Sequence, residues 1–430
     1  MSITPFEPYP VTAKYPIGTR RTEELLTEAR KLSCTERYSY TEGWDDNTLV
    51  DILNLALNRC YNEITQIDNP ANIKEFITNV VAGQQQYPIP KEVYFSIRLV
   101  DVRYLYNGLA SPWAYVTLRQ GAIQDRFSYP TNIPDTYAIR DGFILLSPTP
   151  NQSLNNSLVI NYQERLRSLD VRRGVVSSIL TANGQVAGVS NGNPCEITTQ
   201  AAHGLSNGNL VSLANILGPT MLNGRYYTIT VTGLTTFTLN GIDSTDFPPY
   251  VSGGFWFLNP IQFQLTFPTN SQKDINMQAN AATVLDKIDF CSFTDRYGNS
   301  VVDAISLNGY NATTKVLTCA PDWTFSDEGI VAYNASLLTP NPIYVIQGDY
   351  ASSHSVLDSQ CEDHLIEYLV LRLLRLQSAA EPTQIQMQTE EAVLVRLREA
   401  YRRYRPSVMP IVWQQRLRPM SYPFGRRGMF

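Results

Sequence analysis

Residues 45–81 read DDNTLVDILNLALNRCYNEITQIDNPANIKEFITNVV, and the chain changes its structural pattern within this stretch. The first part has apolar residues at intervals of three to four, as at Leu49, Leu53 and Leu57, behind an Asp/Asn/Thr start signal. This spacing predicts a helix over roughly 47–65. After a turn-rich break, IKEFITNVV (73–81) favours a strand. The fold should therefore combine helices with strands.

Helical spacing recurs near both ends of the chain. Residues 22–33 begin with a threonine cap followed by two glutamates, which favour the positive end of a helix. A helix capped by Ser355, Asp358 or Ser359 should run to Gln377. A last helix is expected over about 384–404 and should end at Pro406.

The region between these helices is rich in Tyr, Gly, Asn and Thr and favours strands. Residues 73–165 predict antiparallel strands, and Asp141-Gly142 supplies the turn of their clearest hairpin. Residues 173–258 and 265–347 form two further strand-rich stretches, each long enough for a small barrel. The strands expected in the second stretch are DKIDFCSF, VVDAISLNGY, KVLTCA, GIVAYNA and PIYVIQGD.

We therefore predict an α+β multidomain protein with one helical-plus-sheet core. Its N- and C-terminal helix pairs should pack with an antiparallel β core that carries two inserted small all-β domains. The expected parts are an arm (1–18), a helical hairpin with the β core (19–172), a β-barrel module (173–258), a second β domain (259–350), a C-terminal helix pair (351–405) and a docking tail (406–430).

Composition limits the class of protein. With 43% hydrophobic and 17% charged residues, the chain can bury cores and is not of the disordered type. No stretch approaches the ~18 apolar residues of a spanning helix, and the N-terminus lacks the apolar core of a secretory signal. We expect synthesis in the cytoplasm and six cysteines held as buried thiols without disulfides.

No motif supports catalysis or a cofactor. Gly188-Val189-Ser190-Asn191-Gly192 fits the GxSxG string, but the sequence continues into a strand instead of the helix that a nucleophile elbow requires. Cys361 and His364 have ligand spacing without a second pair, so we expect a buried thiol and a hydrogen-bonded histidine instead of a metal site. His203 is expected to cap backbone groups.

The C-terminal end has an unusual charge. Residues 396–430 contain nine arginines, no lysine and a single acid, Glu399, so the rest of the chain carries about thirteen net negative charges. Two interpretations of the helical arginines remain open. They could form a solvated basic face in which Glu399 pairs with Arg402 and Arg403, or they could form a docking surface.

Residues 407–430 mix arginine with apolar and aromatic residues, a composition typical of interface hot spots. Protein docking is favoured over nucleic-acid contact, because a DNA-binding domain would normally be basic overall. The residues expected at a partner interface are Ile411, Trp413, Arg416, Arg418, Tyr422, Phe424, Arg426, Arg427 and Phe430.

Residues 195–254 resemble a small β-barrel module of phage virion proteins that is similar to the first catalytic-cysteine half-domain of ubiquitin-activating enzymes. The resemblance lies in Ile197-Thr198, His203-Gly204-Leu205, Asn207-Gly208, Leu222-Asn223-Gly224-Arg225, Tyr227, Thr236-Phe237-Thr238-Leu239 and Gly253-Gly254. Asn209 departs from the Asp that is usual in the module. The resemblance implies no enzymatic role, since this half-domain supplies no chemistry by itself.

The flanking parts resemble the head-to-tail adaptor proteins of tailed phages, in the order of their elements and in stretches such as QQQYPIPKEVYFSIRLVDVRYLY (84–106). The resemblance implies a structural, non-enzymatic virion protein at the head-to-tail junction, in a ring of twelve copies. Its partners would be the portal protein, neighbouring copies, tail or nozzle proteins and, transiently, the passing genomic DNA, with no membrane contact and no cofactor.

Two alternatives remain open at this point. A tail or receptor-binding component could use the β-modules to contact a host surface, but such proteins usually contain repeats and no fixed-period repeat is evident. A virion glycan hydrolase would need a pair of carboxylates that the sequence does not reveal.

Overall fold

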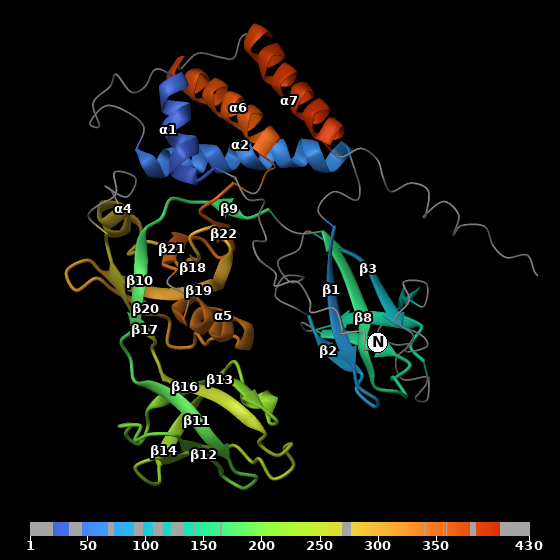
Figure 1. Ribbon diagram of the computed structural model, residues 1–430, viewed down its shortest axis with the longest axis vertical. Helices are drawn as coiled ribbons and strands as arrows, with labels where there is room; N and C mark the ends of the chain where they lie inside the picture. Colours follow the sequence, from blue (N-terminus) through green and yellow to red (C-terminus); the bar gives the residue numbers. More distant parts are fainter. Residues whose placement is uncertain are drawn as a thin grey trace, which may run out of the picture.

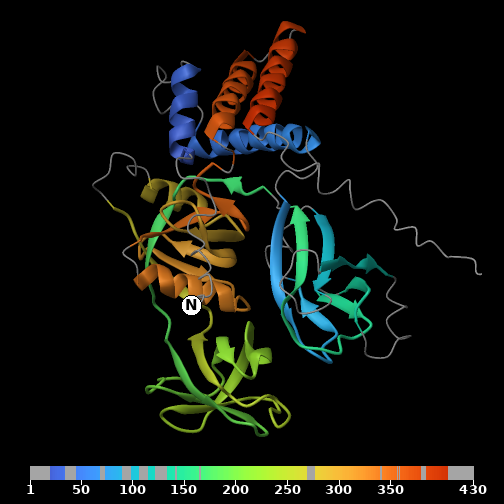
Figure 2. The same ribbon diagram turned by 45° about the vertical axis from the view of Figure 1, so that its right-hand side comes forward.

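The computed structural model places a helix bundle at one end of the molecule, with two small barrels in a column beneath it and a β-sandwich beside the column (Figure 1). A second view gives the same arrangement (Figure 2). The expected α+β multidomain architecture is confirmed. The structure describes residues 20–33, 45–67, 73–89, 98–105, 115–121, 133–140, 143–163, 166–268, 277–338, 341–355, 357, 359–378 and 384–404.

The helix bundle joins the two ends of the described chain. Its helices are α1 (Thr22–Leu32), α2 (Asp46–Ile67), α6 (Ser359–Ser378) and α7 (Gln384–Tyr404). Each begins and ends within about two residues of its prediction, because its apolar residues recur on one face. That face lies in a single hydrophobic cluster, which includes Leu25, Leu53, Leu57, Cys60, Leu365, Leu369, Leu373 and Leu397.

The β-sandwich consists of two antiparallel-rich sheets, ordered β1-β8-β3-β4 and β2-β7-β6-β5. The strands are β1 (Ile73–Val80), β2 (Gln86–Pro88), β3 (Arg98–Leu105), β4 (Tyr115–Thr117), β5 (Arg119–Gln120), β6 (Thr136–Arg140), β7 (Phe143–Ser147) and β8 (Leu154–Gln163). The predicted hairpin is confirmed, since Arg140 pairs with Phe143, while its turn residues lie outside the described part.

The sandwich has its own core, in which Tyr104 and Leu158 of one sheet meet Ile144 and Leu146 of the other. None of the described sandwich residues belongs to the cluster of the helix bundle. The helices and sheets therefore bury separate clusters, where the sequence led us to expect one shared core.

The distal barrel is formed by residues 183–258 and closes in the order β11-β12-β15-β14-β13-β16. Its strands are β11 (Asn183–Val189), β12 (Cys195–Thr199), β13 (Leu210–Leu217), β14 (Arg225–Val231), β15 (Thr236–Leu239) and β16 (Ser252–Leu258), with the 3-10 turn η4 (Thr220–Leu222). Alternate strand residues such as Ile197, Phe237 and Leu239 are buried in the interior.

The proximal barrel closes in the order β10-β17-β20-β19-β18-β21 and carries two helices. Its elements are β10 (Gly174–Ile179), β17 (Gln262–Thr266), α4 (Met277–Val284), β18 (Phe290–Thr294), β19 (Ser300–Asn311), β20 (Val316–Cys319), α5 (Asp327–Leu338) and β21 (Ile343–Gln347). Because β10 pairs with β17 and β21, the distal barrel is inserted into the proximal one. This nesting differs from the two consecutive domains expected at 173–258 and 259–350.

Helix α5 replaces a predicted strand. The segment GIVAYNA (329–335) has strand-like composition, but the hydroxyl of Ser326 accepts the N–H of Gly329 at 3.1 Å and caps a helix. Asp327 and Glu328 in the first turn stabilise the positive helix end. These start signals outweigh the β-branched residues, so the strand prediction was wrong.

The joint between the barrels combines polar and apolar contacts. Asp327 accepts the N–H of Asn215 at 2.5 Å and the side-chain amide of Asn223 at 3.0 Å, both from the distal barrel. The rings of Phe257 and Phe325 lie 5.0 Å apart across the same joint. These contacts hold the two barrels in a fixed relative orientation.

Among the described helices, none is long and apolar enough to cross a membrane.

Candidate functional site

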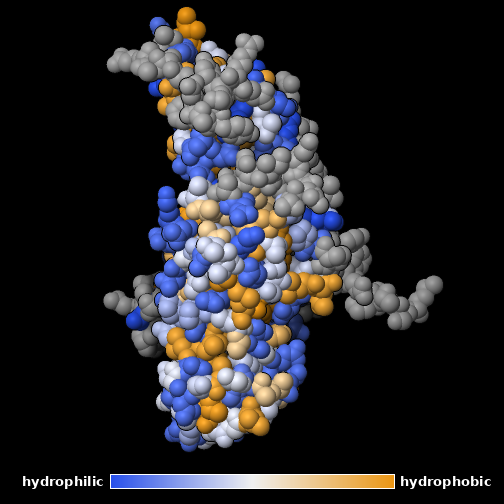
Figure 3. Space-filling model, turned by 90° about the vertical axis from the view of Figure 1, so that its left-hand side faces the viewer, coloured by the Kyte–Doolittle hydropathy of each residue, from blue (hydrophilic) through white to orange (hydrophobic). Residues whose placement is uncertain are grey.

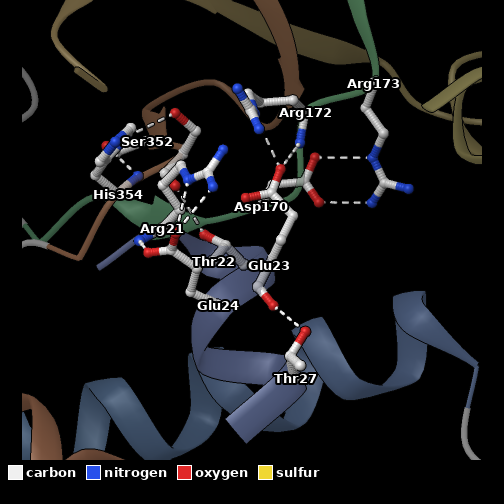
Figure 4. A network of polar contacts seen from close by, with 11 residues as sticks. Arg21, Thr22, Glu23, Glu24, Thr27, Asp170, Arg172, Arg173, Ser352 and His354 are labelled. Carbon is white, nitrogen blue, oxygen red and sulfur yellow. Dashed lines mark hydrogen bonds and ion pairs between the residues drawn. The ribbon is translucent and has the colours of Figure 1, made fainter. Parts of the chain in front are cut away.

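A buried polar junction links the helix bundle to the proximal barrel, and we define it as residues 20–23, 167–173 and 350–355. Within it, β9 (Ser168–Leu169) pairs in parallel with β22 (Ala351–Ser352). Arg21, which precedes α1, forms an isolated bridge with His354. Figure 4 shows how side chains of this junction converge at the N-terminal end of the first helix.

The centre of the junction is an ion pair between Arg173 and Asp170. Two hydrogen bonds of 3.0 and 2.5 Å join the guanidinium to the carboxylate, and the Arg173 side chain is fully buried. Arg173 also donates to the side-chain oxygen of Asn47 on α2, at 2.8 Å. Asp170 accepts the N–H of Gln347 on β21, at 2.7 Å. One buried pair therefore connects the helix bundle to the barrel wall.

Two further arginines of the same segment reach different elements. Arg167 forms a bidentate pair with Asp303 on β19, at 2.9 and 3.1 Å, and its guanidinium lies 3.7 Å from the centre of the Tyr350 ring. Arg172 pairs with Glu23 on α1 at 3.1 Å. The short stretch 167–173 thus binds α1, α2 and the barrel at once. Sequence reasoning missed this stretch, although three arginines beside alternating apolar residues are unusual in a connection.

The start of α1 is held by a buried serine-rich segment. Thr22 donates its N–H to the carbonyl of Ser353 at 3.0 Å, and the hydroxyl of Ser353 lies 3.1 Å from Nδ1 of His354. Burial lowers the pKa of His354; nearby Glu23 opposes this effect, whereas Arg172 acts with it. The Ser353 side chain is completely buried, so this Ser–His contact is structural and cannot meet a substrate.

Two of the motifs found in the sequence have structural roles. Nδ1 of His203 accepts the N–H of Leu205 at 2.9 Å, which confirms the expected backbone cap. Ser190 follows β11, and its hydroxyl accepts the N–H of Glu196, the second residue of β12, at 2.7 Å. The GxSxG string is therefore a turn between strands and has no elbow geometry.

Cys361 is buried in the helix bundle, while Nδ1 of His364 lies 3.6 Å from Glu367. Within the described ranges, no group of three or more His, Cys, Asp or Glu side chains could hold a metal ion. Five cysteines are buried thiols, and Cys34 lies outside those ranges.

The nine tail residues expected at a partner interface are Ile411, Trp413, Arg416, Arg418, Tyr422, Phe424, Arg426, Arg427 and Phe430, and all lie outside the described residues. Two of the helical arginines before them can be placed. Arg398 pairs with the buried carboxylate of Glu63 at 2.5 Å, and Arg396 pairs with Glu367 at 3.0 Å. Both attach α7 to other helices, so they are structural. The side chains of Arg402 and Arg403 are outside the described part.

Two comparisons with known families match this architecture. Residues 22–174 match the family model of the SU10 adaptor protein, which spans the first two helices, the sandwich and the junction segment. Residues 192–257 match the model of the ubiquitin-activating enzyme E1 FCCH domain, which covers most of the distal barrel. A search of curated proteins found no match. The first match supports a phage adaptor, and the second identifies the inserted domain as similar to FCCH.

We predict that Asp170→Ala destabilises the chain by about 3–5 kcal/mol, because it leaves the Arg173 guanidinium buried without its carboxylate. Chemical denaturation would measure the change. Asp243→Ala, at an exposed turn of the distal barrel, is the control and should change stability far less. Equal effects of the two substitutions would contradict a central role for the pair.

The junction should also weaken in mild acid through His354. Its pKa is lowered in the fold, so the unfolded chain takes up the proton first and the free energy of unfolding falls as the pH drops through about 6.5. His354→Gln should show a smaller loss of stability between pH 7 and pH 5 than the wild-type chain. Parallel pH profiles of thermal unfolding would refute this assignment.

Proposed function

We propose that this chain is a head-to-tail connector of a tailed phage, which assembles as a ring of twelve copies between the portal and the tail. The observation that carries the proposal is the adaptor-family match over residues 22–174. That match ends at the first residue of β10, where the barrels begin. The barrels are then additions to an adaptor unit that α6 and α7 complete.

A subunit with a fixed internal geometry suits a closed ring. Each copy must repeat the same contact, and the ring closes only if the angle between neighbours is constant. The junction fixes the helix bundle relative to the proximal barrel, and the contacts of Asp327 fix the distal barrel. These features support a structural role, and we propose that the chain has no catalytic activity.

The charge distribution suits a wall around passing DNA. Residues 396–430 contribute a positive charge of eight and the whole chain has a net charge of −5, so the remainder is strongly acidic. An acidic lumen would repel phosphates and avoid binding the genome during ejection. We propose only transient contact with DNA, at the junction of head and tail in the virion.

The distal barrel is the best candidate for contact with tail components. Leu217, Met221 and Val251 are exposed on it, and Figure 3 shows apolar residues gathered at this end of the molecule. Exposed apolar surface of this kind often marks a protein interface. The same surface also favours the second candidate function, a tail or receptor-binding component that contacts the host surface.

Deletion of residues 407–430 should leave the subunit folded but weaken its binding to purified portal rings by at least about tenfold, an estimate based on loss of one hot-spot cluster. Sedimentation with portal rings would measure binding, and circular dichroism would check the fold. A full-length variant with Arg416, Arg418, Arg426 and Arg427 changed to Lys keeps the charge and tests the need for arginine.

Unchanged portal binding after the deletion would show that the tail does not contribute to assembly on the portal. A full-length chain that does not bind portal rings at all would contradict the connector itself.

A further inference from the structure

Helix α5 exposes an apolar face on the proximal barrel. Val331, Ala335 and Leu338 follow one another at intervals of four and three residues and so share one side of the helix. Val331 is 51% exposed and Leu338 is 88% exposed, with Leu337 beside them at 50%. The other side of α5 carries Ile330 and is packed into the barrel core.

A helix that is apolar on both sides is normally buried on both sides. Helix α5 has no basic residue, and its charged residues are confined to the first turn, so solvent meets mostly apolar atoms along the remainder. We therefore infer that a partner covers this face in the assembled particle.

The surroundings of this face are acidic. Glu328 is exposed one turn before Val331, and Asp322 is exposed in the loop that precedes α5. Within residues 174–179, 260–268, 277–338 and 341–347, the described chain has seven acidic residues and three basic ones, a net charge of −4, and Asp303 among these acids is paired with Arg167 of the junction. The acids are Asp286, Asp289, Asp295, Asp303, Asp322, Asp327 and Glu328, and the bases are Lys287, Arg296 and Lys315. A fitting ligand is therefore both apolar and cationic.

We propose that residues 407–430 of a neighbouring copy occupy the α5 face. This segment contains four arginines and no acid, mixed with apolar and aromatic residues, so it matches the face in both charge and hydrophobicity. The chain after Tyr404 is 26 residues long and can reach about 85 Å when extended, at ~3.3 Å per residue. The inference rests on the proposed ring and names the surface that receives the tail.

The test uses the full-length chain with the photo-crosslinker p-benzoylphenylalanine in place of Leu338. Isotopically heavy and light copies are mixed, bound to portal rings and irradiated, and crosslinked peptides are identified by mass spectrometry. Heavy–light crosslinks from position 338 to residues 407–430 are expected. The control places the same group at Leu234, which is 83% exposed on the distal barrel and should not capture the tail.

Crosslinks from position 338 to the portal, to the tail of the same copy, or to other segments only would overturn the inference. A second variant, Val331→Asp with Leu338→Asp, should lower ring assembly at least tenfold without changing the melting temperature. Unchanged assembly of this variant would also overturn it.

The two proposals can fail separately. If the chain does not bind portal rings, the same crosslinking on the concentrated chain alone still decides whether the tail binds α5. If rings form on the portal without the tail crosslink, only the tail assignment is lost.

Discussion

The bidentate pair between Arg173 and Asp170 is the interaction on which the arrangement of the subunit depends. Both side chains are buried between the helix bundle and the proximal barrel, where two unpaired charges would be very costly. Asn47 of α2 and Gln347 of β21 each add a hydrogen bond to the pair. Since these partners come from separate parts of the chain, the pair selects one orientation of bundle and barrel.

The second joint connects the distal barrel to the proximal barrel. The distal barrel leaves the proximal one after β10 and returns at β17, and these strands are paired there, with Ile179 opposite Phe263. The ends of the insertion are therefore adjacent, so a whole barrel can be added without opening its host. The contact between the Phe257 and Phe325 rings and the hydrogen bond from Asn215 to Asp327 then orient the distal barrel relative to the proximal one. An adaptor unit can gain a rigid projecting arm in this way.

The sequence predicted those features that depend on neighbouring residues. Apolar spacing located the four helices of the bundle, and the FCCH-like motif located the distal barrel. Pairing over long separations was not predictable: β10 is a six-residue strand whose partners begin more than eighty residues later. The junction was missed for the same reason, because Arg167 and Asp303 are 136 residues apart. The expected tail interface remains a prediction.

The central claim is that this chain is a rigid connector at the head-to-tail junction, and an image of the intact virion tests it most directly. If the chain is such a connector, the image should show a twelvefold layer between portal and tail, into which the helix bundle and both barrels fit as a single rigid body. Finding the chain only at the tips of tail fibres, or outside the portal–tail axis, would contradict the proposed connector role.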